Sequence, residues 1–287
     1  MSLDSLAVFV ITASTNVSVL LLLSLGLAIV FGIRGIINLA HGEFVMVGAY
    51  VAVKLNALQV PFVVAIVLGP LGVAALGLLV ERVLIRRLYD RLADCMLATW
   101  GLSLILTQVV TLVYGPTTAG MAFPLGNVSV GSYRVATYDL VIIGVAAIAL
   151  TALFLLMRRT RFGLLARATA RSSGMAEALG VDTARIDMFT FGAGAAAAGF
   201  AGAVLAPFLG VSPTMGQNFI AKAFMTVLVG GADYILGTLS AAFLLGGFEA
   251  TLARWLIPVI GQVGLLLLAI AIVRFRPYGL SRAAVRR

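Results

Sequence analysis

The segment INLAHGE, from Ile37 to Glu43, gathers three polar side chains between two long apolar runs. They are Asn38, His41 and Glu43, and Arg34 lies just before them. If the segment is helical, Asn38 and His41 are three residues apart and share a face. Because an ionisable group at membrane depth is costly, these groups are candidates for a solute pathway. The alternative is that they cap and satisfy the break between two helices.

The sequence lacks the motifs of several other chemistries. The nucleotide-binding motif GxxxxGK[ST] needs a Gly-Lys pair, and neither of the two lysines, Lys54 and Lys222, follows a glycine. His41 is the only histidine and Cys95 the only cysteine, so the chain cannot build a His/Cys metal site, and nothing frames His41 as part of a catalytic triad. We expect a protein that is not an enzyme and holds no cofactor or metal of its own.

The composition is that of a membrane protein. Of 287 residues, 62% are hydrophobic and 11% are charged, and the mean hydropathy is +1.12. These values exclude a soluble globular enzyme. The net charge of +9 comes from arginines that bunch in three places, so it reflects membrane topology and not nucleic-acid binding. We expect one all-α membrane domain, a polytopic helix bundle over residues 1–287.

Eight or nine apolar segments could cross the membrane as helices. The seventh and eighth are short and are separated only by a glycine-rich turn around Gly230, Gly231 and Asp233, so they could form a broken or re-entrant element. The candidate segments are 5–32, 36–56, 61–81, 95–114, 138–157, 187–209, 219–232, 235–251 and 256–273.

The arginines also indicate orientation. They cluster in residues 82–91, 158–185 and 274–287, and the positive-inside rule places all three clusters, the C-terminus included, in the cytoplasm. Residues 115–137 carry one charge and residues 210–218 carry none, so both are expected outside. With nine spans the N-terminus is outside too.

Small residues line the segment FGAGAAAAGFAGAVLA from Phe191 to Ala206. Ala195, Gly199 and Ala203 lie four residues apart, a spacing that lets helix backbones approach closely. The pattern predicts tight helix packing, and the alternative is a helix that lines a pathway or slides during gating.

The arginine-rich segment over about residues 158–186 is expected to be a cytoplasmic loop. Its Ala, Met, Leu and Glu content favours a short helix around Ser173–Leu179, and Gly180 is well placed to stop it. A basic helical loop could lie on anionic lipid or dock into a partner protein.

Three long motifs resemble those of a known family. They are GLAIVFGIRGIINLAHGEFVMVGAY from Gly26, MAEALGVDTARIDMFTFGAG from Met175, and AGFAGAVLAP, which ends at Pro207. They resemble the membrane subunits of ATP-binding-cassette importers of the branched-chain amino acid class, over nearly the whole chain. VDTARIDMFTFGAG, GVSPTMGQNFIAKAFMTVLVGG and RFRPYGL look closest to the urea-importing branch. Asp233 and Tyr234 depart from the smaller or uncharged residues expected in their turn.

The resemblance implies a permease of the bacterial inner membrane with four partners. These are a homologous second permease, two cytoplasmic ATPases that hold ATP and Mg, and an extracytoplasmic solute-binding protein. It also implies that residues 166–182 form a coupling helix that sits in a cleft of an ATPase, where Arg167 and Arg171 could pair with acidic groups. The candidate coupling residues are Arg167, Arg171, Glu177, Ala178, Gly180 and Asp182.

From this resemblance we expect import of urea, or of a short amide, by alternating access. A neutral solute suits a nearly uncharged path, whereas a zwitterionic amino acid would prefer fixed charges or helix termini at both its ends. The alternatives are a branched-chain amino acid as substrate and, from another class, a passive channel for a small neutral solute.

The candidate pathway residues are amides, hydroxyls and the INLAHGE cluster: Asn38, His41, Glu43, Thr107, Gln108, Gln217 and Asn218. Lys222, Asp233 and Glu249 are single charges near expected helix ends. Capping or snorkelling explains each of them about as well as transport does.

Overall fold

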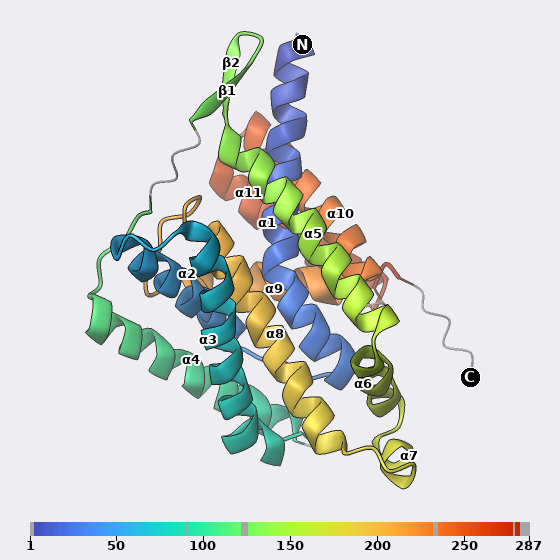
Figure 1. Cartoon of the computed structure of the whole chain (residues 1–287). Coiled ribbons are helices and arrows are strands. Elements are labelled where there is room, and N and C mark those ends of the chain that lie inside the picture. The colour runs from blue at the N-terminus through green and yellow to red at the C-terminus, as the bar shows by residue number, and fades with distance from the viewer. Residues whose placement is uncertain (1–2, 90, 122–125, 232–234, 278, 282–287) are drawn as a thin grey trace.

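A computed structural model describes residues 3–89, 91–121, 126–231, 235–277 and 279–281. In these ranges the chain folds into eleven α-helices, one 3₁₀ turn and one antiparallel hairpin, so the expected helical bundle is confirmed (Figure 1). The elements are α1 (Leu3–Arg34), α2 (His41–Ala57), α3 (Phe62–Val83), η1 (Ile85–Arg87), α4 (Leu92–Tyr114), β1 (Asn127–Val130), β2 (Tyr133–Ala136), α5 (Thr137–Arg159), α6 (Arg161–Arg171), α7 (Ser173–Ala178), α8 (Thr183–Leu205), α9 (Met215–Gly230), α10 (Leu236–Trp255) and α11 (Pro258–Phe275).

Two helices, α1 and α8, form the centre of the bundle (Figure 1). α8 packs against α3, α2 and α1, and α1 also packs against α10, α5 and α9. Every residue from Leu20 to Val30 of α1 is buried. A helix that is apolar all round needs neighbours on every side, and α1 has them. By contrast, only 17%, 22% and 17% of the membrane-spanning windows of α4, α5 and α11 are buried.

Small residues explain how closely α8 meets its neighbours. A Cβ on Gly202 would overlap the Val45 carbonyl of α2, and one on Gly199 would lie 2.7 Å from the Val73 side chain of α3. Gly48 of α2 meets the backbone of Gly199 in the same way. Since the backbones touch with no side chain between them, the predicted close packing is confirmed.

Seven helices in the described part of the chain are long and apolar enough to cross a membrane. They are α1, α3, α4, α5, α8, α10 and α11. α2 and α9 have only 17 and 16 residues. The expected count of eight or nine spans is therefore approximate. The two short helices touch at their starts, where the backbones of Gly42 and Gly216 meet.

The segment before α2 is not helical, which corrects the expected start of the second span at residue 36. α1 ends at Arg34, Gly35 takes a positive φ of 65°, and α2 begins only at His41. A glycine with positive φ is a common helix stop. Residues 35–40 then lead the chain into the bundle, so Asn38 and His41 do not share a helix face.

One further element differs from the sequence expectations. The hairpin of β1 and β2, which turns at Gly131, was not expected; it lies beside the N-terminal end of α1, where Ser132 N–H donates to Asp4 at 3.4 Å. Asp233 and Tyr234 lie outside the described residues. Among the described residues, Gly230 of α9 and Gly237 of α10 touch through their backbones.

Candidate functional site

Three of the candidate pathway residues lie buried together at the start of α2. Asn38, His41 and Glu43 are 2%, 1% and 1% exposed. The Asn38 Oδ1 accepts from the backbone N–H of Ala40 at 3.0 Å, so this side chain does satisfy the break between the helices. The His41 Nε2 lies 3.0 Å from the Leu23 carbonyl of α1. Because a carbonyl only accepts, Nε2 carries the proton.

Polar atoms in this cluster remain unpaired within the described ranges. His41 Nδ1, Glu43 Oε2 and Thr107 Oγ1 are buried without a hydrogen-bond partner. Thr99 and Ser103 of α4 lie on the same helix face as Thr107, four residues apart; Thr99 Oγ1 accepts a backbone N–H at 3.1 Å, and Ser103 hydrogen-bonds to Glu43. Buried polar atoms usually have partners or ordered water. The contact between α2 and α4 is therefore a polar strip with spare hydrogen-bonding capacity.

The other candidate pathway residues do not join this strip. Gln108 is exposed on α4, and Gln217 and Asn218 are exposed in the first turn of α9. The seven candidates thus do not form one site. The structure turns His41 toward Leu23 of α1, places Leu39 and Glu43 against the α4 face of Thr99 and Ser103, and leaves the three amides Gln108, Gln217 and Asn218 at the surface.

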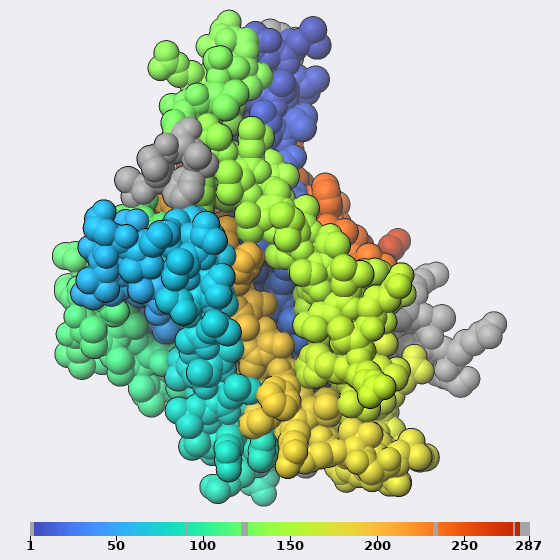
Figure 2. Space-filling model, viewed as in Figure 1, coloured from blue at the N-terminus to red at the C-terminus, as the bar shows by residue number. Residues whose placement is uncertain are grey.

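The loop over residues 158–186 contains the short helix that the sequence predicted. α7 begins after the N-cap Ser172, whose hydroxyl accepts from Met175 N–H at 3.3 Å, and Gly180 follows it with a φ of 83°. The predicted stop at Gly180 is confirmed. α6 and α7 project at one end of the molecule, close to the start of α8 (Figure 2).

The candidate coupling residues divide into two groups. Those with local roles are Arg167, which donates to the Met157 carbonyl at the end of α5, Glu177, which accepts from the Thr183 hydroxyl at 2.5 Å, and Asp182, which caps α8. Those that are exposed on the loop are Arg171, Ala178 and Gly180. Met175 and Leu179, which are 64% and 78% exposed, stand beside them. Sequence analysis did not single out these two apolar residues.

A second polar cluster ties the arginine-rich ends of α1, α3 and α8 together. Arg34 pairs with Asp187 of α8, and its guanidinium lies 5.1 Å from the ring centre of Tyr89. Tyr89 donates to Glu81 at 3.1 Å, and Arg86 binds the same carboxylate at 3.0 Å. Burial, together with the Glu81 charge, raises the pKa of Tyr89, so its hydroxyl stays a donor. We call these five residues the end clamp.

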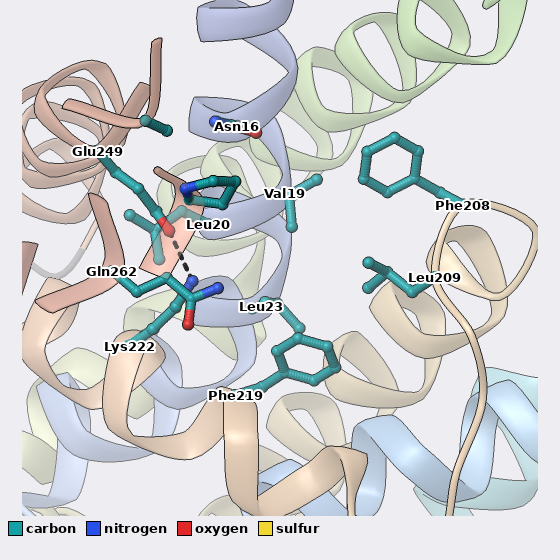
Figure 3. Close-up of a pocket in the computed structure, with 12 residues that line it drawn as sticks. Asn16, Val19, Leu20, Leu23, Phe208, Leu209, Phe219, Lys222, Glu249 and Gln262 are labelled. Carbon is teal, nitrogen blue, oxygen red and sulfur yellow. Dashed lines mark hydrogen bonds and ion pairs between the residues drawn. The ribbon is translucent and has the colours of Figure 1, made fainter. Parts of the chain in front are cut away.

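A third polar feature pairs two residues that the sequence left as single charges. Lys222 of α9 lies 2.7 Å from the carboxylate of Glu249 of α10. The pair borders a cleft of about 270 Å³ between α1, α9, α10, α11 and the segment after α8 (Figure 3). Sequence analysis missed the pair because its members are 27 residues apart on different helices, which no local spacing can reveal.

Comparisons with known proteins identify the family. Residues 9–273 match the family described as branched-chain amino acid transport system / permease component. The chain is 32% identical over 280 residues to the Escherichia coli K12 protein named high-affinity branched-chain amino acid transport system permease protein LivH, with 90% of each chain covered. It is 30% identical over 277 residues to the Pseudomonas aeruginosa permease protein BraD, also with 90% of each covered.

A more distant relative is the probable branched-chain amino acid transport permease protein LivH of Methanocaldococcus jannaschii, 28% identical over 291 residues, or 92% of this chain and 89% of that one. No solved structure matches. The family is that of a multi-pass membrane permease component, not of an ATPase, and implies ATPase and other subunits in a transporter complex. This chain belongs to the family of permease components of branched-chain amino acid transport systems.

Proposed function

We propose that this chain is the membrane-spanning subunit of an ATP-driven importer for branched-chain amino acids. The observation that carries the proposal is the family match over residues 9–273, together with relatives named for branched-chain amino acid transport that align over nine-tenths of their length. Their names give no support to the urea expected from the sequence. The alternative stated there, a branched-chain amino acid, therefore becomes the main interpretation.

In this proposal the chain works with a homologous second permease, two ATPases that hold ATP and Mg, and an extracytoplasmic solute-binding protein, while membrane lipid covers the rest. The chain itself holds no cofactor. Its exposed apolar helices supply surface for lipid and for the second permease. On α4, for example, Ile105, Leu112 and Val113 are 61%, 76% and 67% exposed.

The arginine-rich end faces the cytoplasm in this proposal, and so does the C-terminus. The exposed loop residues Arg171, Met175, Ala178, Leu179 and Gly180 then form the contact with an ATPase. Glu177 links α7 to Thr183 at the start of α8, and α8 packs against α1, α2 and α3. A push on α7 would thus reach the centre of the bundle directly, which suits transmission of ATPase closure.

The test is genetic and needs no knowledge of the partners. The chromosomal gene is deleted in the native host, the chain is restored from a plasmid, and uptake of radiolabelled leucine and of radiolabelled urea is measured with and without depletion of cellular ATP. We expect restored leucine uptake that needs ATP. Restored urea uptake without leucine uptake, or uptake that survives ATP depletion, would overturn the proposal.

The same cells test the coupling surface. Leu179→Ser changes an exposed side chain of the loop, and Val128→Ser changes an exposed side chain of the hairpin at the other end. We expect the first variant to lose leucine uptake at normal protein level and the second to retain it. Equal uptake by the two variants would remove Leu179 from the coupling surface.

A further inference from the structure

We propose that the cleft beside Lys222 and Glu249 binds the charged head group of the transported amino acid. The Lys222 ammonium would hold the substrate carboxylate, and the Glu249 carboxylate would hold the substrate ammonium. This inference rests on the proposed function and deepens it, because it names the residues that recognise a zwitterion.

The pair has spare hydrogen-bonding capacity. An ammonium has three donors and a carboxylate about four acceptor sites, and the bond between Lys222 and Glu249 occupies one of each. Both side chains keep part of their surface open to the cleft, at 20% and 13% exposure. The amides of Asn16 and Gln262 flank the pair (Figure 3). A ligand with one negative and one positive group could bind both charges without leaving either unpaired.

The rest of the cleft wall suits a hydrocarbon side chain. There the side chains are apolar: Figure 3 shows Phe208 and Leu209 across from the ion pair, and the ring of Phe219 beside Lys222 on α9. The volume of about 270 Å³ lies just below the range of ordinary small-molecule pockets, so the cleft suits a small ligand. One polar wall and one aliphatic and aromatic wall match an amino acid whose side chain is a branched hydrocarbon.

The cleft lies deep in the bundle. Along α1, Leu23 lies about 16 Å and Asn16 about 27 Å from Arg34, at a rise of 1.5 Å per residue. Both residues line the cleft. The cleft therefore runs from the middle of the bundle toward the end remote from the arginines. An ion pair at this depth is costly to desolvate, which makes it a candidate for function rather than for stability alone.

The competing explanation is that the pair only fastens α9 to α10. A double variant, Lys222→Met with Glu249→Gln, separates the two because it leaves no unpaired charge. We expect this variant to reach wild-type level in the membrane and to bind its ATPase, while leucine uptake in the deletion strain falls by about tenfold or more, as for lost charge-assisted hydrogen bonds. Near wild-type uptake by the double variant would overturn the site.

A labelling experiment on the assembled transporter reports on binding itself, even if the double variant does not assemble. In a Cys95→Ala background, Ala253→Cys places a thiol at the cleft, and Ser129→Cys places one on the hairpin as a control. We expect leucine to slow maleimide labelling of the first thiol only. Leucinamide, which lacks the carboxylate, and 4-methylpentanoate, which lacks the ammonium, should not protect.

No protection by leucine, or protection by either analogue as strong as that by leucine, would overturn the site. The proposed function fails separately. If the unaltered chain does not restore leucine uptake to the deletion strain, the substrate assignment is wrong whatever the variants do. If it restores uptake and the cleft variants behave as wild type, only the site is wrong.

Discussion

The end clamp and the Lys222–Glu249 pair use the same kinds of side chain in opposite surroundings. In the end clamp, Glu81 is fully buried, Asp187 is 4% exposed, and each carboxylate meets a guanidinium, with a tyrosine completing the group. Lys222 and Glu249 bind one another, and both line an open cleft. The end clamp uses its hydrogen-bonding capacity to join three helix ends, whereas the Lys222–Glu249 pair keeps donors and acceptors free for a ligand. The number of hydrogen-bonding partners around an ion pair thus distinguishes a pair that only joins helices from one that can also bind a ligand.

The largest effect is expected from breaking the end clamp. Asp187→Ala leaves the mostly buried Arg34 without its carboxylate, which should lower the free energy of unfolding by about 3 to 5 kcal/mol. The matched control is Arg185→Ala, which removes an exposed pair with Asp182 and should cost less than about 1 kcal/mol. The measurement is the unfolding midpoint in detergent by fluorescence-detected gel filtration. Similar midpoints for both variants would contradict the assignment.

A smaller effect is expected at the cleft. Lys222→Met alone leaves Glu249 unpaired but beside open space, so the loss should be about 1 to 3 kcal/mol. Adding Glu249→Gln should recover most of it, since no buried charge remains. The same midpoint assay checks this. A double variant that is less stable than the single one would mean that the pair serves to hold α9 against α10, as the end clamp holds its helices together.

Tyr89→Phe should cost about 1 kcal/mol, the usual net worth of one hydrogen bond, because only the bond to Glu81 is lost while Arg34 still covers the ring. A loss as large as that of Asp187→Ala would show that Tyr89, and not the ion pairs, organises the cluster.

The smallest effect is a dependence on alkaline pH. The pKa of Tyr89 is raised in the folded protein, chiefly by burial, so its contribution is complete below the ordinary tyrosine pKa of about 10 and is lost as pH rises toward the raised value. Above about pH 10 the midpoint of the wild type should therefore fall more steeply than that of Tyr89→Phe. Parallel curves for the two proteins would refute this account.

Hydropathy and small-residue spacing predicted the helices and the packing of α8 well, because both are local properties of the chain. The predicted start of the second span was wrong because residues 35–40 are mostly apolar. Hydropathy does not distinguish an extended apolar segment from a helical one. The sequence does contain a signal for the hairpin. In NVSVGSYRVA, alternating residues flank a Gly-Ser turn, which is a hairpin pattern.

The candidate sites were predictable only where one segment supplies all the residues. INLAHGE and the α7 loop are of this kind. The end clamp needs α1, α3 and α8 together, and the cleft pair joins α9 to α10. Such pairs depend on the three-dimensional fold, and a single sequence shows their members only as isolated charges.

The meeting of Gly42 and Gly216 has an electrostatic consequence. It brings the amino-terminal ends of α2 and α9 side by side inside the bundle, and each helix end carries roughly half a positive charge. Glu43 lies in the first turn of α2, next to both ends, and among the residues that the structure describes no basic side chain pairs with it. The amino-terminal ends of the two helices thus create a positive potential at this buried side chain, which favours negative charge there.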